Sequence, residues 1–211
     1  MSTARDALRP VLEDAREAGF LGPGPIEAHL DHAAGFATAA ESALGRPPTR
    51  FVDLGTGGGV PGLVLALRWT SARGVFVDSG HRRSTFLREA TERLDVRDRV
   101  EVVEGRAEAL GRDEIYREVF DVATARSFAA PAVTAEISAG LVVVGGVLVV
   151  SEPPDPDPAS RWPVAGLREL GFGPEAPVSH GGAHYAVLPK VAPCPERFPR
   201  AVGRPGKRPL W

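Results

Sequence analysis

The chain has 211 residues, of which 43% are hydrophobic and 25% are charged, and its formal net charge at pH 7 is −2. These values are typical of one soluble globular domain that can bury a core, and they do not by themselves indicate a nucleic-acid-binding protein. The single cysteine, Cys194, excludes an intramolecular disulfide and a cysteine metal cluster. The acids in residues 1–20 argue against a targeting peptide, and the lack of a long apolar stretch argues against a membrane span. We therefore expect the protein in the cytoplasm.

Two helices are predicted ahead of the first strand, and together they form an N-terminal extension over residues 1–48. Residues 1–18 alternate acids and bases in helical fashion, and residues 25–44 are an Ala-rich segment that a glycine and two prolines end. His29 and His32 show H-x-x-H spacing within the second helix. Zinc requires further ligands that do not lie nearby, so we expect structural or surface roles for both histidines and no metal site.

Residues 51–62, with the sequence FVDLGTGGGVPG, predict a buried strand, a glycine-rich turn and the start of a helix. Gly55, Gly57 and Gly59 permit backbone conformations and a close ligand approach that a Cβ would obstruct. The pattern G-x-G-x-x-G is also satisfied within this segment, so a dinucleotide is one candidate ligand. The segment therefore predicts a nucleotide-like ligand at the end of the strand.

Asp53 distinguishes between the candidate ligands. Its carboxylate stands two residues before Gly55, where the amides of the helix start would otherwise favour a pyrophosphate. Negative charge repels phosphate and suits a cofactor with sulfonium and ammonium groups, namely S-adenosyl-L-methionine. The alternative is an aspartate that only caps the turn.

Two further strands end in residues that suit the same crevice. Residues 74–79 end near Asp78, whose position after the glycine turn is typical of an acid that accepts hydrogen bonds from ribose hydroxyls. A strand at 100–103 leads into the turn 105–108, and the turn after a third strand borders the same crevice in doubly wound sheets. Backbone amides and the Glu108 side chain can meet an adenine edge there.

The segment 119–128 predicts a fourth strand and the loop that follows it, and Arg126 in that loop points at the crevice. The count of elements predicts an α/β fold with a seven-stranded, mostly parallel sheet, helices on both faces and a core spanning residues 49–191. The remaining elements are a helix at 131–141, a strand at 145–152, an acidic Pro-rich loop at 152–158, a helix at 161–172, a faint strand near 175–180 and a strand at 184–191.

Residues 192–211 are predicted to form a basic, Pro-rich tail. Between residues 190 and 211, six basic residues and Glu196 give a net charge of +5, so the remainder of the chain carries −7. Arginine presents a planar fork that matches phosphate oxygens, which would let this tail contact RNA. A solvated tail in an Arg-rich protein is the equally supported alternative.

Five ordered segments resemble motifs of the bacterial methyltransferases that modify a guanine of 16S ribosomal RNA at N7, a family also called glucose-inhibited division protein B. These segments are VDLGTGGGVPG, FVDSGHRRSTFLREA, GRAEAL, TARSF and FPRAVGRPGKRPL. The resemblance implies a single Rossmann-like class I methyltransferase domain, with S-adenosyl-L-methionine as cofactor. It also implies ribosomal RNA or the small ribosomal subunit as partner.

By matched position, the resemblance implies that Gly55 and Val60 line the methionine end of the cofactor, that Ala107 and Glu108 frame the adenine, and that Arg126 lies where cofactor and substrate meet. The substrate-binding residues expected from the resemblance and the basic tail are Arg126, Arg200, Arg204 and Lys207. The complete set of expected cofactor-binding residues is Asp53, Gly55, Thr56, Gly57, Gly59, Val60, Asp78, Ala107, Glu108 and Arg126.

The chain departs from the family pattern in two places. Family members usually carry an Asn-Leu-Thr segment followed by a His-x-x-Asp-Ser stretch. Here the Asn-Leu-Thr segment is absent, and the residue three positions after His29 is His32 instead of aspartate. Ser151 and Glu152 stand where the family commonly shows Lys-Gly. Both changes concern the expected RNA substrate, and neither touches the expected cofactor site.

The loop after the fourth strand offers only Arg126 and Ser127 as polar groups, so the sequence provides no clear general base and no assigned catalytic residue. Guanine N7 has a free lone pair and needs no base, whereas an oxygen nucleophile usually does. Methylation of a nucleobase nitrogen is therefore favoured. The alternatives are methylation of a small metabolite or another RNA, a cofactor-binding module without catalysis and, disfavoured by Asp53, a nicotinamide dehydrogenase.

Overall fold

Seven strands form one sheet at the centre of the computed structural model, which describes residues 2–155 and 157–211. The strands are β1 (Arg50–Leu54), β2 (Arg73–Asp78), β3 (Val100–Glu104), β4 (Phe120–Ala125), β5 (Val142–Glu152), β6 (Ala176–His180) and β7 (Ala183–Pro189). Their order in the sheet is β3-β2-β1-β4-β5-β7-β6. β1 to β5 pair in parallel, and β7 is antiparallel to both neighbours, which confirms the expected seven-stranded, mostly parallel sheet.

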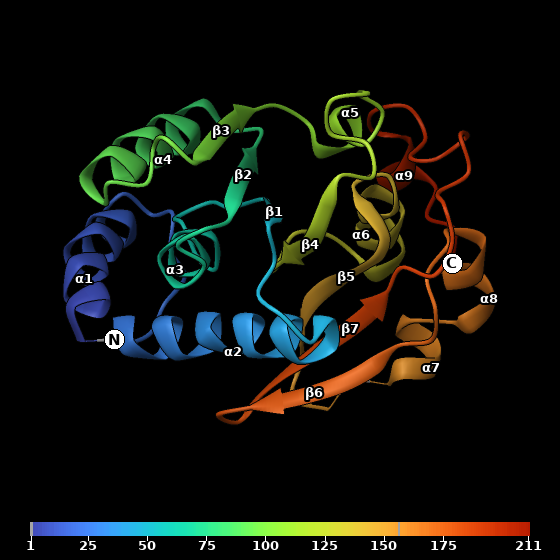
Figure 1. Cartoon of the computed structure of the whole chain (residues 1–211), viewed down its shortest axis with the longest axis horizontal. Helices are drawn as coiled ribbons and strands as arrows, with labels where there is room; N and C mark the ends of the chain where they lie inside the picture. Colours follow the sequence, from blue (N-terminus) through green and yellow to red (C-terminus); the bar gives the residue numbers. More distant parts are fainter. Residues whose placement is uncertain (1, 156) are drawn as a thin grey trace.

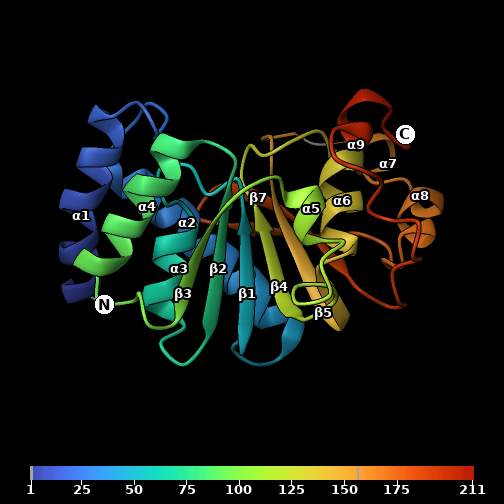
Figure 2. The same ribbon diagram turned by 90° about the horizontal axis from the view of Figure 1, so that it is seen from above.

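Helices cover both faces of this sheet, as expected. Figures 1 and 2 show helices at both ends of the molecule, with the strands between them. The helices are α1 (Ser2–Glu17), α2 (Ile26–Leu44), α3 (Gly62–Arg68), α4 (His81–Arg93), α5 (Ala107–Leu110), α6 (Pro131–Ala139), α7 (Pro158–Arg161), α8 (Val164–Glu169) and α9 (Arg204–Lys207).

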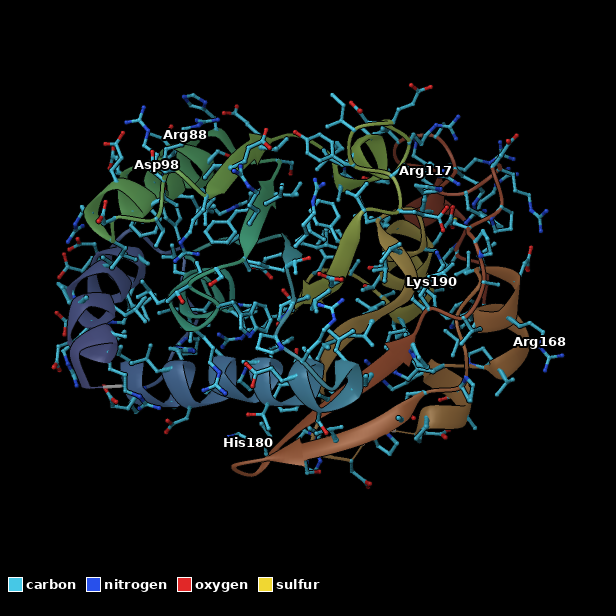
Figure 3. All side chains as sticks on the ribbon, in the orientation of Figure 1. Arg88, Asp98, Arg117, Arg168, His180 and Lys190 are labelled. Carbon is cyan, nitrogen blue, oxygen red and sulfur yellow. The ribbon has the colours of Figure 1, made fainter. Side chains whose placement is uncertain are left out.

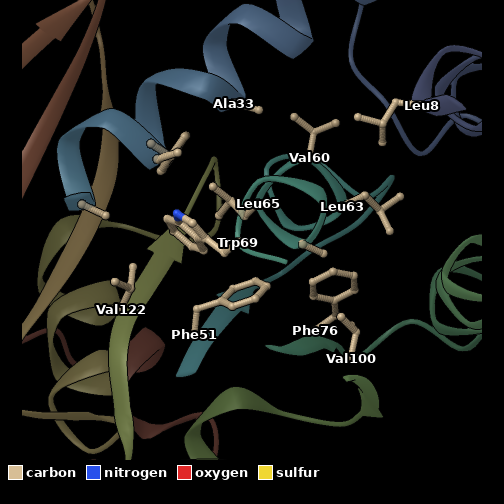
Figure 4. Packing of buried hydrophobic residues seen from close by; sticks show 14 of the residues in the cluster. Leu8, Ala33, Phe51, Val60, Leu63, Leu65, Trp69, Phe76, Val100 and Val122 are labelled. Carbon is tan, nitrogen blue, oxygen red and sulfur yellow. The ribbon is translucent and has the colours of Figure 1, made fainter. Parts of the chain in front are cut away.

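Alternation along the strands divides the hydrophobic core into two clusters. In β1, Phe51 packs with α1 to α4 on one face, whereas Val52 packs with α5, α6 and α8 on the other. Side chains of a strand point alternately to its two faces, so a sheet covered by helices on both sides requires apolar residues at nearly every position. Figure 4 shows the first cluster, in which the Phe51 ring meets the Trp69 ring edge-on at 5.2 Å between centroids.

The helix α2 lies close against β7 at Gly35. A Cβ at this position would overlap the Tyr185 hydroxyl, so only glycine fits there without a shift. The Tyr185 hydroxyl donates a 2.7 Å hydrogen bond to the His32 carbonyl of α2, and the Tyr185 ring contacts the ring of Phe36 edge-on. These contacts fix the height of α2 above the sheet.

Several element boundaries differ from the sequence prediction. The helix expected at 161–172 is the shorter α8, at 164–169, and the separate helix α7 ends before it at Arg161. Pro163 separates them because it lacks an N–H group and disfavours a helical conformation at Trp162. The strand expected at 145–152 begins earlier, at Val142, with an irregular register opposite β4. The faint strand expected near 175–180 is β6 at the sheet edge. Met1 and Pro156 of the expected elements lie outside the described residues.

Lys190 follows β7 and is almost completely buried. Its Nζ donates to a Glu118 carboxylate oxygen at 2.8 Å, to the Ala139 carbonyl at 2.8 Å and to the Val142 carbonyl at 3.0 Å. Figure 3 labels Lys190 among the inner side chains, whereas Arg168 and His180 lie at the outer edge of the molecule. The buried ammonium thus joins the end of α6 to the start of β5.

The segment 192–211 packs on the domain rather than extending into solvent. Arg117 donates to the Cys194 carbonyl at 3.0 Å and to the Phe198 carbonyl at 2.8 Å. Trp211 lies against Gly166 of α8 and donates through its indole N–H to the Arg161 carbonyl at 2.9 Å. The segment predicted as a basic tail is therefore an ordered strap with the short helix α9 next to α6, and the alternative of a solvated tail is wrong.

Candidate functional site

A crevice of about 710 Å³ lies at the carboxyl ends of the first four strands. Its walls come from the turn after β1, the end of β2, the segment between β3 and α5, and the loop after β4. Two further walls come from the linker between α1 and α2 and from residues near α9. Ligands of open α/β sheets bind at this edge, next to the point where the strand order reverses between β1 and β4.

The glycine-rich turn after β1 forms the floor of the crevice. Gly55 and Gly57 have φ values of +66° and +57°, which L side chains rarely adopt, and both line the crevice with Thr56 and Val60. A Cβ on Gly55 would also lie 2.8 Å from the Phe128 ring. The turn is thus built from residues that keep side-chain bulk away from a ligand.

Gly59, which was also expected to bind the cofactor, shapes the turn instead of lining the crevice. Its N–H donates to the Thr56 carbonyl at 2.9 Å, its φ is +93°, and a Cβ there would overlap the Leu63 side chain. The role of Gly59 in this structure is to let the chain pass close to α3.

Asp53 does not form an acidic floor of the crevice, and this corrects the sequence interpretation. Its side chain has no exposed surface and accepts hydrogen bonds from the Gly62 N–H at 3.0 Å and the Thr124 hydroxyl at 2.6 Å. Burial raises the pKa of Asp53 to about 7, against these hydrogen bonds, which lower it. Asp53 therefore joins β1 to β4 and to the start of α3 beneath the turn, which is close to the capping alternative.

Asp78 stands at the crevice wall, as the sequence predicted. Its carboxylate accepts hydrogen bonds from the Gly57 N–H at 3.0 Å, the Gly80 N–H at 2.8 Å and the Arg83 guanidinium at 2.8 Å. A carboxylate has about four acceptor positions, so one remains for a ligand hydroxyl. The three protein donors hold the group in place.

Ala107 and Glu108 also line the crevice, at the start of α5. The Glu108 carboxylate is buried, forms an ion pair of 2.8 Å with Arg106 and accepts a 3.3 Å hydrogen bond from the Gly203 N–H. These partners lower the pKa of Glu108 although burial opposes them. The carboxylate is thus engaged in joining α5 to the strap.

Arg126 reaches the crevice from the loop after β4, as predicted, and is half-buried. Its Nη2 atom lies 2.8 Å from Nδ1 of His29. His29 is 5% exposed, and its other ring nitrogen lies 3.1 Å from the Gly22 carbonyl of the linker between α1 and α2. The structure therefore gives His29 a contact with the site in addition to its packing role.

The basic residues expected to contact substrate fall into two groups. Arg204 and Lys207 are exposed on α9, next to Gly206 and Pro209, which line the crevice. Arg200 is not free, because it forms an ion pair of 2.5 Å with the fully buried Glu136 carboxylate of α6. The sequence interpretation of Arg200 as a substrate contact is thus replaced by a role in fastening the strap.

Glu152, which departs from the family pattern, lies in a smaller cavity of about 300 Å³ on the other side of the 127–129 loop. Its carboxylate is 2% exposed, forms an ion pair with Arg161 and accepts a 3.0 Å hydrogen bond from the Trp162 indole. Glu152 is therefore neutralised by a cation from α7 and does not project into the main crevice.

Sequence reasoning missed the linker between α1 and α2 as part of the site. Phe20, Leu21 and Gly22 line the crevice, as does Phe128. The Phe20 ring meets the Phe86 ring of α4 edge-on at 5.7 Å, with the Arg82 guanidinium 5.5 Å from its centroid. No periodic pattern marks such a linker. The only available signal was an aromatic residue between two glycine-containing stretches.

Neither metal ligands nor membrane spans emerge from the described part of the chain. Residues 2–155 and 157–211 contain no group of three or more His, Cys, Asp or Glu that could hold a metal ion. Over the same residues, no helix combines the length and the apolar character that crossing a membrane requires.

Comparison with known proteins gives a consistent result. The GidB family model, described as rRNA small subunit methyltransferase G, matches residues 29–152. A relative from Roseiflexus castenholzii, named ribosomal RNA small subunit methyltransferase G, is 38% identical over 172 residues, which cover 79% of this chain and 73% of the relative. A relative of the same name from Leuconostoc citreum is 32% identical over 183 residues, covering 80% and 72%.

Solved structures share the fold at low sequence identity. An O-methyltransferase from Bacillus cereus in complex with SAH has a TM-score of 0.61 and 18% identity, over 88% of this chain and 91% of that chain. An O-methyltransferase family protein from Burkholderia thailandensis has a TM-score of 0.58 and 16% identity, and the match covers 74% of this chain but 55% of that one. The expected Rossmann-like methyltransferase fold is confirmed by these matches.

Proposed function

Because the chain belongs to the family of small-subunit ribosomal RNA methyltransferases G, as its motifs predicted, we propose that it transfers a methyl group from S-adenosyl-L-methionine to N7 of a guanine in 16S ribosomal RNA. The observation that carries the proposal is the crevice itself. It brings the glycine turn, Asp78 and Arg126 together at one edge of the sheet. A ribosomal RNA substrate also implies that the protein works in the cytoplasm.

The residues of the crevice suit this cofactor. The positive φ values of Gly55 and Gly57 create a floor that a Cβ would fill, and Asp78 keeps an acceptor position for a ribose hydroxyl. Ala107 lines the crevice at the place proposed for an adenine edge, and the Arg126 guanidinium suits the carboxylate of an amino acid. When bound, the cofactor supplies an electrophilic methyl group.

The reaction would depend on the positioning of the acceptor nitrogen relative to the methyl group and would need no proton transfer. The loop after β4 presents Arg126 and Ser127, and the acids Asp78 and Glu108 are held by protein donors. A guanine N7 attacks with a free lone pair and loses no proton, so it needs alignment and a short approach distance more than a base. The lining of the crevice therefore favours a nucleobase nitrogen as acceptor.

The RNA backbone would lie along α9, in this proposal. Arg204 and Lys207 are exposed there, beside the wall of the crevice, and α9 follows the left-handed Gly203. Phosphate contacts position a nucleic acid and make its binding depend on salt. Replacing both basic residues with alanine should weaken RNA binding and reduce the slope of log K against log salt by roughly 1 to 2. Arg168→Ala on α8 is the matched surface control.

The decisive experiment uses purified protein, methyl-labelled S-adenosyl-L-methionine and small ribosomal subunits from cells that lack the corresponding enzyme. Nucleoside mass spectrometry should find label in 7-methylguanosine from the 16S RNA. Label in a component of a metabolite extract, with none in RNA, would replace the proposed substrate by a small molecule. Cofactor binding without any labelled product would indicate a binding module.

A further inference from the structure

The hydrogen bonds of His29 determine where its proton lies. An arginine only donates hydrogen bonds, so His29 Nδ1, at 2.8 Å from Arg126 Nη2, must be the acceptor. The remaining proton is then on Nε2, which donates to the Gly22 carbonyl at 3.1 Å. The imidazole is therefore neutral and joins the linker at Gly22 to the guanidinium in the crevice.

Arg126 keeps its charge in this arrangement. Within residues 2–155 and 157–211 it makes no ion pair with a carboxylate. The Asp53 carboxylate, which Gly62 and Thr124 hold, acts on Arg126 only through its field and favours the charged guanidinium. A neutral acceptor fixes the direction of the guanidinium without cancelling its charge. A carboxylate at position 29 would fix the direction as well but would neutralise the group.

We infer that His29 is a positioning residue that holds the Arg126 guanidinium in the crevice as a cation without an ion-pair partner among the described residues, ready for an anionic oxygen of a ligand. This oxygen belongs either to the carboxylate of the cofactor or to a phosphate of the RNA. The inference rests on the proposed function and adds to it a residue outside the lining of the crevice. It also explains why a buried, hydrogen-bonded histidine stands next to an arginine rather than next to an acid.

The charged groups that face His29 are Arg126 after β4 and Arg16 on α1, and both oppose its protonation. His32, one turn further along α2, is a neighbouring titratable group. Burial and then the Arg126 charge lower the pKa of His29, with the Gly22 carbonyl acting in the opposite direction. Protonation of Nδ1 at low pH would make the His29 ring a cation and remove the lone pair that accepts from Arg126. The contact would then break, so ligand binding should weaken as pH falls.

The test compares His29→Asn with His29→Asp in the full chain, because the two side chains have the same shape and differ by one charge. Calorimetry would measure binding of S-adenosylhomocysteine and of 5′-methylthioadenosine, which lacks the amino-acid carboxylate. Nucleoside analysis would give KM and kcat for the RNA. Thermal unfolding would establish that both variants fold.

If the cofactor carboxylate is the partner, His29→Asp should bind S-adenosylhomocysteine about tenfold more weakly than His29→Asn, with equal binding of 5′-methylthioadenosine.

If an RNA phosphate is the partner, the difference between the two variants appears in KM for RNA and not in binding of S-adenosylhomocysteine. In either case the difference should vanish in an Arg126→Gln background, because the charge that the introduced carboxylate neutralises is then absent. Nitrogen NMR of the wild type should also show a His29 ring protonated at Nε2 alone.

The inference is wrong if the two variants have the same affinity for S-adenosylhomocysteine and the same KM for RNA. It is also wrong if a difference between them persists in the Arg126→Gln background. Either result leaves the proposed function in place. A wild-type protein that binds S-adenosylhomocysteine and methylates no RNA overturns the proposed substrate, and the comparison of the two variants for S-adenosylhomocysteine still decides the role of His29. A wild type that binds neither ligand overturns both.

Discussion

The Asp78 carboxylate accepts a 3.0 Å hydrogen bond from the Gly57 N–H, so the end of β2 is joined directly to the glycine turn that follows β1. The same carboxylate accepts from Gly80 and Arg83 at the start of α4. One acid thus fixes two walls of the crevice and leaves a single acceptor position towards the ligand.

Asp78→Asn should therefore reduce both cofactor binding and stability. The asparagine amide has one acceptor oxygen where the carboxylate has two. Its NH₂ group would face one or more of the donors from Gly57, Gly80 and Arg83, which now meet a carboxylate oxygen. We expect a loss of about 1 to 3 kcal/mol in the free energy of unfolding and at least about a tenfold loss in affinity for S-adenosylhomocysteine. Urea unfolding and calorimetry measure the two effects. Asp98→Asn, at an exposed position, is the control, and unchanged affinity in Asp78→Asn would exclude a role at the ribose.

Gly55→Ala should damage the floor of the crevice in two ways. The φ of +66° strains any L side chain, and the new Cβ would lie 2.8 Å from the Phe128 ring. Gly45→Ala is a matched control, because its φ is +68° and nothing lies within 4 Å of a Cβ there. We expect Gly55→Ala to lose about 1 kcal/mol or more beyond the control, together with cofactor affinity. Equal stability of the two variants would show that Phe128 yields freely.

Lys190→Met should be strongly destabilising because it removes a buried cation from three acceptors. Glu118, which also accepts from the Cys194 N–H, would be left as a partly uncompensated acid, and two carbonyls would lose their donor. The expected loss is about 3 to 5 kcal/mol in the free energy of unfolding. The double variant Lys190→Met/Glu118→Gln should recover part of it, and Lys207→Met on the surface should cost little. A loss below about 1 kcal/mol would contradict this account.

His32 makes stability depend on pH between about 6.5 and 4. Burial, followed by the charges of Arg126 and His29, lowers the pKa of His32 to about 4 from its ordinary 6.5, and its Nδ1 atom has no hydrogen-bond partner among the described residues. The folded state therefore favours the neutral ring. Stability is fully present above pH 6.5 and is lost as pH falls towards 4, because the unfolded chain then binds the proton more tightly.

His32→Phe should remove most of this dependence, on the order of 2 kcal/mol between pH 7 and pH 4. The phenyl ring keeps the contacts with Phe36 and Tyr185 and brings no nitrogen into the aromatic cluster. Urea unfolding at a series of pH values measures the change, with exposed His180→Phe as control. A pH profile identical to that of the wild type would show that His32 is not the titrating group.

The framework of the fold and much of the crevice could be predicted from the sequence because they depend on local patterns. Apolar runs ending in glycine or an acid located β1 to β3, an apolar run before Arg126 located β4, and the carboxyl ends of parallel strands meet at one edge. Asp78, the turn 105–108 and Arg126 were placed at the crevice on this basis, and the structure shows all three there. The family resemblance rested on the same segments together with residues 198–210, and the family is confirmed by the family model, which matches residues 29–152.

The remainder depends on contacts between distant residues, which a local pattern does not contain. Asp53 is hydrogen-bonded to Thr124 on the neighbouring strand instead of lining the crevice, and Arg200 forms an ion pair with Glu136 of α6 instead of lying free in solvent. His29 and Arg126 are 97 positions apart, and H-x-x-H spacing gave no indication of their contact. Net charge likewise described the last twenty residues as a basic tail, without showing that they pack on the domain.

The close approach of α2 to β7 at Gly35 has an evolutionary consequence. The Tyr185 hydroxyl occupies the space that a larger residue at position 35 would need. Descendants of this chain can therefore accept alanine or serine at 35 only with a smaller side chain at 185, so the two positions should change as a pair. His29 lies on the same helix, and a lineage that altered one partner alone would also displace the histidine that reaches Arg126.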